Sequence, residues 1–426
     1  MPAVRFALFA SIALLLAPTA SALRVEPLAW TPGKGSAQPS VTALPEGDFL
    51  LNWQQREGEY ARLRVARLAA DADVPEMRAD LAHGRDWFLN WADFPSLAVL
   101  DNGDWVGFTL RRSARSPGAT DIHLQRSTDG GASWSAPVRV DAREPAGQRG
   151  FAALLADGED RALLVWLDAG ALPGQEAPHG EAHGHDHHGH DHGSAMRLRA
   201  AVFGRDGQPR ELAELDADTC SCCPTDLVRH GGEVLAVYRD HAQGIRDIAF
   251  VRRNHEGRWQ TPQPVHVDGW RMPGCPVNGP AAAVNGERLA VAWSTMANGP
   301  MQVKLALRPA PGADFAVPLL LDSGAAVLGR VDVAPWREGG FLVGWVGGEG
   351  GDAVLRLAEV DAGGRLVGQH EVTRLPPGRQ LGQPRLAASG DTALLVWTEP
   401  GSGGTRVRLA RLQNREQDQP SIRPSR

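Results

Sequence analysis

A unit of four short β-strands recurs along almost the whole chain. Each copy has an apolar first strand, a second strand that usually carries Trp or Tyr, an Arg-rich third strand with period-two alternation, and a fourth strand after a turn. Copies follow one another every ~50 to 70 residues, which is typical of a four-stranded β-propeller blade. The second strands of the seven copies lie at residues 49–53, 105–109, 162–166, 234–238, 289–293, 341–345 and 393–397.

The order of the strands predicts how the ring closes. The last copy stops near Leu412 after three strands, and residues 23–28, before the first copy, can supply its missing outer strand. No amphipathic helix of useful length is present. We therefore predict an all-β fold, a propeller of antiparallel four-stranded sheets over residues 23–412, followed by a disordered tail over residues 413–426.

The first 22 residues have the pattern of a signal peptide. Arg5 precedes an apolar run over residues 6–16, and Ala20 and Ala22 form an A-x-A cleavage site. The apolar run is shorter than the roughly 20 residues that span a bilayer, so we expect no membrane span. We expect an exported bacterial protein that is periplasmic or secreted.

The charge of the chain limits its partners. It has 44 Lys and Arg against 50 Asp and Glu, with a formal net charge of -6. Nucleic-acid binding requires a basic surface, so DNA and RNA are not expected as partners. We expect a monomer whose partner is a small molecule, a glycan or a metal ion.

One segment in the second copy links the chain to a known family. Residues 127–134, Ser-Thr-Asp-Gly-Gly-Ala-Ser-Trp, match the Asp-box pattern S-x-D-x-G-x-x-W. Asp129 can accept hydrogen bonds from the turn's own amides, Gly131 permits a left-handed residue, and Trp134 can pack between sheets, with Ser127 opening the box. The chain thus resembles the sialidase-like, Asp-box (BNR repeat) propellers. The resemblance implies that the box is structural and lies on the face opposite the active site. Propellers of this family usually have six blades, whereas seven copies are found here, so the sequence leaves the number of blades at six or seven.

Strand alternation predicts which face carries function. The loop that leads into each blade, here called its leading loop, shares one face with the loop between that blade's second and third strands. The leading loops over residues 85–95, 220–226 and 274–279 are rich in unusual residues. Propellers commonly bind ligands at this rim of the central channel. Arg239, Arg246 and Trp91 are candidate ligand-binding residues there, since Arg binds carboxylates bidentately.

Four cysteines lie in two leading loops. Cys223-Pro224 and Cys275-Pro276 have equivalent positions in adjacent blades, so their side chains can meet, with Cys220 and Cys222 close by. In an exported protein they can form disulfides, of which only Cys220 to Cys223 with Cys222 to Cys275 is unstrained. The alternative is a thiolate site for a soft metal, Cu or Zn, completed by His241, Met272 or Met296. The spacing leaves both open.

A histidine-rich insertion lies on the same rim, over residues 179–192. Such tracts bind Zn, Ni or Cu weakly. The alternative is a solvated loop that binds no metal and whose composition is free to vary. Its candidate metal ligands are His183, His185, His187, His188, His190 and His192.

The family resemblance also raises the question of catalysis. A sialidase of this kind has an Arg-Ile-Pro motif, an arginine triad and a late-blade tyrosine nucleophile, none of which is found here; the only tyrosines are Tyr60 and Tyr238. The principal hypothesis is therefore an exported propeller that binds a ligand or soft metal at the cysteine-bearing rim. The alternative is a glycoside hydrolase acting on extracellular glycans, either sialidase-like with Tyr238 or using Asp93 with Asp240 or Asp247 as a carboxylate pair.

Overall fold

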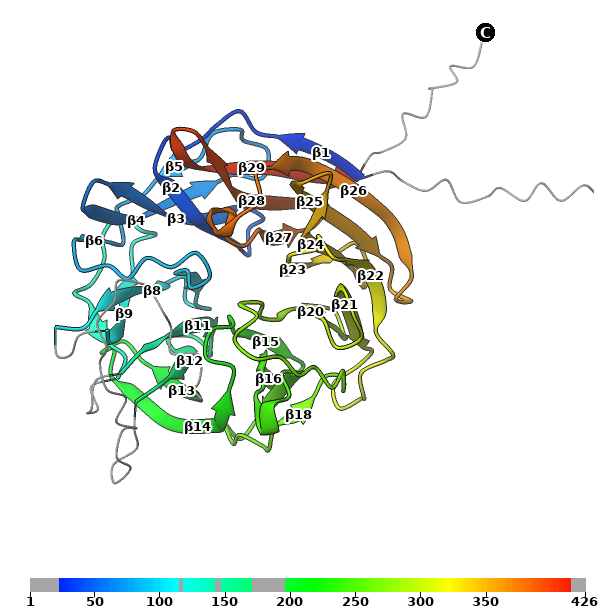
Figure 1. The fold of residues 1–426 in the computed structure, drawn as a ribbon. Helices are drawn as coiled ribbons and strands as arrows, with labels where there is room; N and C mark the ends of the chain where they lie inside the picture. The colour runs from blue at the N-terminus through cyan, green and yellow to red at the C-terminus, as the bar shows by residue number, and fades with distance from the viewer. Residues whose placement is uncertain (1–22, 115–117, 142–146, 171–195, 415–426) are drawn as a thin grey trace, which may run out of the picture.

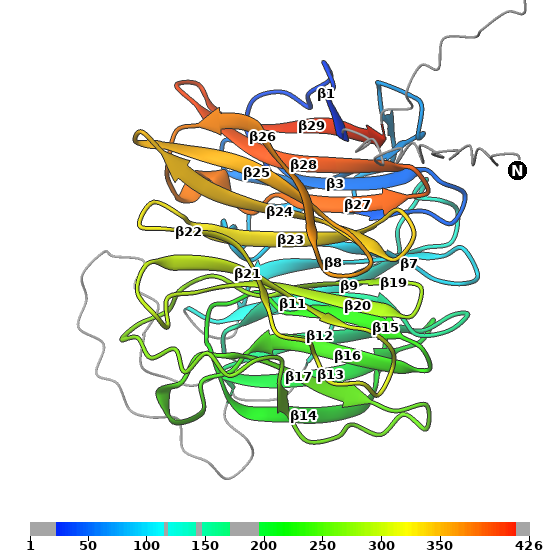
Figure 2. The same ribbon diagram turned by 90° about the vertical axis from the view of Figure 1, so that its right-hand side faces the viewer.

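The computed structural model describes residues 23–114, 118–141, 147–170 and 196–414, which form a ring of seven antiparallel sheets. Figure 1 shows the sheets arranged radially around a central axis, and Figure 2 shows the same ring from the side. The predicted all-β propeller is confirmed, and it has seven blades. The only helical segments in the described residues are two 3-10 turns, η1 (Ala242–Gly244) and η2 (Arg379–Leu381).

The first strand of each blade lies nearest the axis and the fourth lies at the outer edge (Figure 1). Blades 1 to 3 consist of β2 (Ser36–Ala43), β3 (Phe49–Glu57), β4 (Tyr60–Leu68) and β5 (Glu76–Met77), with β6 (Ala82–Gly84) also on β4; β7 (Leu97–Val99), β8 (Trp105–Arg112), β9 (Thr120–Ser127) and β10 (Val138–Arg139); and β11 (Arg149–Ala156), β12 (Ala162–Asp168), β13 (Met196–Phe203) and β14 (Pro209–Thr219). Blades 4 and 5 consist of β15 (Asp226–His230), β16 (Glu233–Arg239), β17 (Ile248–Arg253) and β18 (Gln263–Pro264); and β19 (Ala281–Asn285), β20 (Arg288–Thr295), β21 (Met301–Arg308) and β22 (Leu319–Gly324). Blades 6 and 7 consist of β23 (Gly329–Trp336), β24 (Gly340–Glu349), β25 (Asp352–Val360) and β26 (Leu366–Leu375); and β27 (Arg385–Ser389), β28 (Thr392–Gly401), β29 (Gly404–Asn414) and β1 (Leu23–Pro27).

Blade 7 is completed by the N-terminal strand. β1 pairs antiparallel with β29, from Leu23 opposite Asn414 to Pro27 opposite Ala410. The predicted closure by residues 23–28 is confirmed. It places the first and last strands of the described chain side by side and leaves blade 7 with a full set of four strands.

The aromatic residues of the second strands form the interior between blades. Trp53, Trp166, Trp293 and Trp345 are all at most 2% exposed, and each lies opposite Arg or Lys on the third strand. In blade 5, for example, Trp293 Nε1 donates to Asp268 at 2.7 Å, and Lys304 Nζ pairs with the same carboxylate at 2.6 Å. The basic alternation of the third strands therefore places cations beside the buried tryptophans, and in blades 5 and 6 the tryptophan and the cation share one carboxylate.

Three inner strands carry a β-bulge that redirects a side chain. Gln38 in β2, Phe151 in β11 and Arg330 in β23 have φ values of 45°, 51° and 55°, each within a register shift. A bulge turns one side chain away from the ladder. Arg330 accordingly stacks on Trp91 of a leading loop, with its Cζ atom 4.5 Å from the ring centroid.

The segment that matches the Asp-box pattern, residues 127–134, occupies the turn between the third and fourth strands of blade 2. Ser127 Oγ accepts a hydrogen bond from the Gly131 amide at 2.8 Å, and Asp129 accepts one from the Ser133 amide at 2.9 Å. The hydrogen bonds from Ser133 lower the pKa of Asp129 to about 2. Gly131 has φ +84° and no room for a Cβ beside the Trp105 ring, while Trp134 Nε1 donates to the Ala79 carbonyl. These contacts hold the turn together.

Candidate metal centre and its surroundings

The four cysteines form one compact cluster where the leading loops of blades 4 and 5 meet. Their Sγ atoms all lie within 4.8 Å of one another. Cys222 and Cys275 are joined by a disulfide with a Cα–Cα distance of 6.3 Å, and Cys220 and Cys223 are thiols. The Cys220 sulfur lies 3.1 Å from that of Cys223 and 3.5 Å from that of Cys275. The prediction that two leading loops bring the cysteines together is confirmed.

Close backbone packing holds the two loops against each other. A Cβ atom on Gly279 would collide with the carbonyl oxygen of Pro224, so the chain after Cys275 can approach the chain after Cys223 only with glycine at this position. The Cys220 amide also donates to the Arg239 carbonyl at 3.0 Å. The cluster is therefore positioned by the backbone of both blades.

Two buried arginines lie beside the sulfur atoms. Arg246 Nη1 donates to Cys220 Sγ at 3.2 Å, and Arg246 is 5% exposed. Arg239 is 1% exposed, and its three guanidinium nitrogens donate to the carbonyls of Asn278, Arg246 and Ser294. Within the described part of the chain, no carboxylate forms an ion pair with either guanidinium. Both were expected to bind a ligand directly, whereas here they support the cysteine loops.

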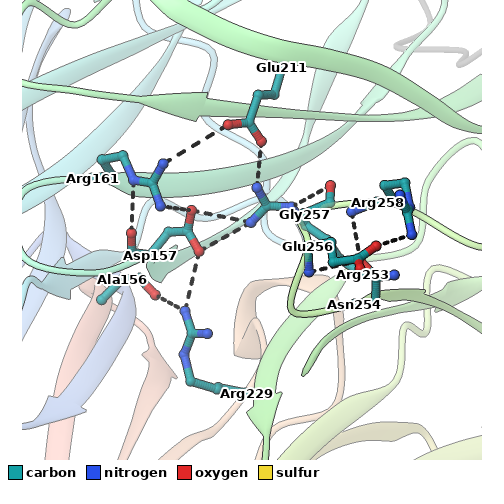
Figure 3. A network of polar contacts seen from close by, with 10 residues as sticks. All are labelled: Ala156, Asp157, Arg161, Glu211, Arg229, Arg253, Asn254, Glu256, Gly257 and Arg258. Carbon is teal, nitrogen blue, oxygen red and sulfur yellow. Dashed lines mark hydrogen bonds and ion pairs between the residues drawn. The ribbon is translucent and has the colours of Figure 1, made fainter. Parts of the chain in front are cut away.

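The opposite face contains a buried arginine that is neutralised by carboxylates. Figure 3 shows Arg253 between the carboxylates of Asp157 and Glu211, at 3.1 and 2.5 Å. Arg161 and Arg229 also pair with Asp157. This network joins blades 3 and 4 by ordinary ion pairs. Arg246, by contrast, donates to a sulfur atom, Cys220 Sγ at 3.2 Å, and has no carboxylate partner among the described residues.

The surroundings affect the two thiols in opposite directions. A hydrogen bond from Cys223, together with the charges of Arg239 and Arg246, lowers the pKa of Cys220 to about 6 despite its burial. Burial and the neighbouring Cys220 sulfur raise the pKa of Cys223. One thiolate that accepts a hydrogen bond from one thiol is therefore the favoured state of this pair.

The histidines predicted as further ligands are not placed in the cluster. His241 Nδ1 lies 2.8 Å from Asp218 Oδ1, and the group of ligand atoms contains sulfur alone. Met296 is 45% exposed, and Met272 uses its carbonyl to accept from Arg246 at 3.5 Å. His183, His185, His187, His188, His190 and His192 lie outside the described residues.

The catalytic candidates of blade 4 are engaged in local contacts. The Tyr238 hydroxyl donates to Asp216, and burial followed by the charge of Asp216 raises the pKa of Tyr238. Asp240 accepts from the amides of His241 and Ala242. Asp247 accepts from the amides of Gly269 and Trp270. These groups shape loops and strand ends.

Asp93 has a different environment, at the inner strands. It lines a cavity of about 110 Å³ together with Asp226 and Arg385, but without Asp240 or Asp247. Burial raises the pKa of Asp93 to about 7, opposed by the Phe151 amide. Its Oδ1 atom is buried and has no hydrogen-bond partner among the described residues. The expected carboxylate pair of Asp93 with a blade 4 acid is therefore not brought together in this cavity.

Sequence reasoning missed a second, larger hollow on the loop face. A cleft of about 700 Å³ is lined by Lys34, Arg56 and Arg379, with Trp91 and the buried Gln54 also on its surface. Three basic residues so far apart in the chain give no local pattern. The unusual leading loop around Trp91 was the only signal of this cleft.

Comparison with known proteins gives the fold. No family model and no curated protein matches the chain. Among solved structures, a protein of unknown function from Dyadobacter fermentans matches with a TM-score of 0.51 and 12% identity, over 92% of this chain and 99% of that one.

Two enzymes of known activity are also similar. The α-L-arabinanase of Penicillium chrysogenum has a TM-score of 0.46 and 13% identity, over 89% of this chain and 93% of its own. The NanB sialidase of Streptococcus pneumoniae has a TM-score of 0.45 and 8% identity, over 92% and 94%. The chain itself has a seven-bladed β-propeller fold. At these identities the likeness concerns the fold and not the activity.

The described residues contain no helix that is long and apolar enough to cross a membrane.

Proposed function

We propose that the reduced protein binds one soft metal ion, Zn(II) or Cu(I), through Cys220, Cys222, Cys223 and Cys275. One observation carries this proposal. Four sulfur atoms within 4.8 Å of one another lie beside Arg246, a buried cation that donates to Cys220. A positive charge beside the sulfur favours the thiolate, which is the form that binds a metal ion.

The sulfur spacing suits a tetrahedral ion. Metal–sulfur bonds of ~2.3 Å place the four sulfurs of such a site about 3.8 Å apart. The separations of 3.1 and 3.5 Å and the outer limit of 4.8 Å fall around this value. Small side-chain rotations are therefore enough to surround a metal ion.

The charge balance favours a divalent ion. Four thiolates and Zn(II) carry two net negative charges, and Arg239 and Arg246 supply two positive ones at the same place. With Cu(I) the site keeps one further negative charge. Among the two soft metals, Zn(II) is thus the better match.

Metal binding requires the Cys222–Cys275 disulfide to be reduced, because its sulfurs are not free thiolates. A dithiol reductant transfers two electrons and two protons, giving Cys222 and Cys275 thiols and an oxidised reductant. The proposal therefore concerns the reduced chain, in an exported protein whose residues 1–22 have been removed. It makes no use of Tyr238, Asp240 or Asp247.

Metal titration of the protein in both oxidation states tests the proposal. Under anaerobic, reducing conditions we expect four reactive thiols and one Zn(II) or Co(II) per chain, with the charge-transfer absorption of thiolate-bound Co(II). The disulfide form is the matched control, with the same sequence and two thiols, and should lose this site. Cys275→Ser should lose it in either state.

A second experiment distinguishes the cysteine site from weak metal binding by the histidine-rich insertion. Deletion of residues 180–192 should remove weak binding at several positions and leave the stoichiometric site intact. If the reduced protein binds neither Zn(II) nor Cu(I) more tightly than about millimolar, the cysteines have only a structural role and the proposal is wrong.

A further inference from the structure

The large cleft on the loop face lies outside the cysteine cluster and is formed by the meeting of blades 1 and 7 with the leading loop of blade 2. Lys34 precedes β2, Arg56 is the penultimate residue of β3, Arg379 begins η2, and Trp91 comes from the leading loop of blade 2. Its volume of about 700 Å³ is in the range of small-molecule sites. Residues 403–405, at the turn between β28 and β29, also line it, so five separate segments converge on one hollow.

The charge of this cleft is opposite to that of the chain. Lys34, Arg56 and Arg379 line it and no Asp or Glu does, although the chain has a net charge of -6. Among the described residues, none of these three cations forms an ion pair. The nearest acids along the chain, Glu57 and Glu59, pair instead with Arg62 and Arg85. The cleft therefore presents positive charge that is free to meet a ligand.

Backbone contacts position two of the three cations. The Arg56 amide donates to the Gly35 carbonyl at 2.9 Å, and a Cβ on Gly35 would come within 2.5 Å of the Arg56 carbonyl oxygen. The Lys34 side chain lies over the turn between β28 and β29, with its Nζ atom 3.7 Å from where a Cβ on Gly403 would stand. Lys34 and Arg56 are thus held on adjacent segments.

Arg330 supports the other side of the cleft. It donates to the carbonyls of Gly378 and Gly382, which flank Arg379, at 3.0 and 3.2 Å. The same guanidinium stacks on the Trp91 ring, with its Cζ atom 4.5 Å from the ring centroid. The buried Arg330 side chain therefore holds both the turn of Arg379 and the ring of Trp91 in place.

The buried side of the cleft has a polar atom without a partner. Gln54 is 3% exposed, and its Oε1 atom makes no hydrogen bond with any described residue. Leaving a buried acceptor unpaired costs about 1 to 3 kcal/mol, which a ligand hydroxyl can recover. Gln38 lies beside it in the same cleft with φ 45°, a backbone strain of the kind that collects at binding sites.

We infer that this cleft binds a hydroxyl-bearing organic anion with two or more acid groups, carboxylates or phosphates. Lys34, Arg56 and Arg379 bind the acid groups, and Gln54 Oε1 accepts a hydrogen bond from the hydroxyl. This inference is independent of the metal proposal, since none of these residues contacts a cysteine sulfur in the described structure.

Calorimetric titration of the disulfide form with three probes tests the inference, since this form has no complete metal site. Citrate and tricarballylate carry the same three carboxylates, but only citrate has a hydroxyl; fructose 1,6-bisphosphate represents the phosphates. We expect one citrate or one bisphosphate per chain, tighter binding of citrate than of tricarballylate, and weaker binding as salt is raised.

The variants assign the binding to the cleft. The triple variant Lys34→Gln, Arg56→Gln, Arg379→Gln should lose affinity by more than about tenfold, since each cation contributes a factor of up to about five. Arg258→Gln removes a charge from an exposed turn between β17 and β18 and should change nothing. Gln54→Leu should abolish the preference for citrate over tricarballylate. If the triple variant does not fold, Arg379→Gln alone should still weaken binding.

Several outcomes would overturn the inference. These are no binding of any anionic probe below about millimolar, equal losses in Arg258→Gln and the triple variant, or equal binding of neutral fructose and its bisphosphate. Binding of only the carboxylates or only the phosphates supports the inference and identifies the acid group.

Discussion

Arg246 donates a hydrogen bond to the sulfur of Cys220 across 3.2 Å, from the loop between β16 and β17 to the leading loop of blade 4. Both residues are at most 5% exposed. A buried guanidinium that has sulfur as its nearest anionic partner stabilises thiolate over thiol. The contact thus holds the cysteine loop in place and also favours the Cys220 thiolate. Substitution of Arg246 tests both effects.

Arg246→Gln should raise the pKa of Cys220, because the variant loses the positive charge beside the thiolate. Reduced protein should then bind Zn(II) at least about tenfold more weakly, since one strong charge-assisted contact is lost. Arg271→Gln is the matched control, because Arg271 is exposed and donates to the Gln243 carbonyl without touching a cysteine. Ultraviolet absorbance of the thiolate against pH, with competition titration of Zn(II), measures both effects. Equal affinities of the two variants would contradict this role for Arg246.

Gly279→Ala should separate the two cysteine loops. The new methyl group has no room against the Pro224 carbonyl, so the loops must move apart at a cost of about 1 to 3 kcal/mol in unfolding free energy. Disulfide formation and metal affinity should both fall. Gly232→Ala is the control, because a Cβ there would meet only His255, at 3.9 Å. Denaturant unfolding and thiol counting compare the two, and unchanged thiol counts in Gly279→Ala would oppose the packing argument.

Asp93 should make the protein less stable as pH rises. Its carboxyl is held neutral by burial, with a pKa of about 7, whereas the unfolded chain ionises near pH 4. The folded state therefore binds the extra proton between these values, and its stability falls as pH increases from about 4 to 7 and then levels off. The loss is up to about 4 kcal/mol.

Asp93→Asn should reduce this slope. An amide resembles the neutral carboxyl and its oxygen can still accept from the Phe151 amide, so the variant should be more stable than the original protein above pH ~7 and similar near pH ~5. Some slope should remain, because burial also raises the pKa of Asp332 to about 6. Urea unfolding at several pH values measures this, with the exposed Asp391→Asn as control. An identical slope in Asp93→Asn and the original protein would refute the assignment.

The repeat pattern of the sequence was enough to predict the propeller because each blade repeats the same local physics. Alternation places Trp53 or Trp293 inside and Arg64 or Lys304 opposite it, and the same pairing recurs in blades 3, 6 and 7. Equivalent positions also predicted that Cys223 and Cys275 meet. Periodicity carries such information because both loops leave their blades in the same way.

What the sequence could not predict were contacts to backbone atoms and between distant segments. Arg239 was expected to bind a ligand, but its donors are taken by carbonyls of Asn278, Arg246 and Ser294, which have no sequence signature. The cleft of Lys34, Arg56 and Arg379 joins residues from the two ends of the chain. Only ring closure, a global property, places these residues together.

Tyr238→Phe should lower the stability of the protein and should not change any catalytic activity. The Tyr238 hydroxyl is buried and donates to Asp216 between blades 3 and 4, where no substrate can reach it. Removing it leaves a carboxylate oxygen without this donor, which should lower the unfolding free energy by about 1 to 3 kcal/mol. A fluorogenic sialoside should not be hydrolysed by the original protein, because a tyrosine nucleophile must face the substrate. Urea unfolding and a sialoside assay on both proteins test these statements. Turnover that vanishes in Tyr238→Phe would reverse the assignment of this tyrosine, and turnover that survives there but vanishes in Asp93→Asn would place the chemistry at the Asp93 cavity instead.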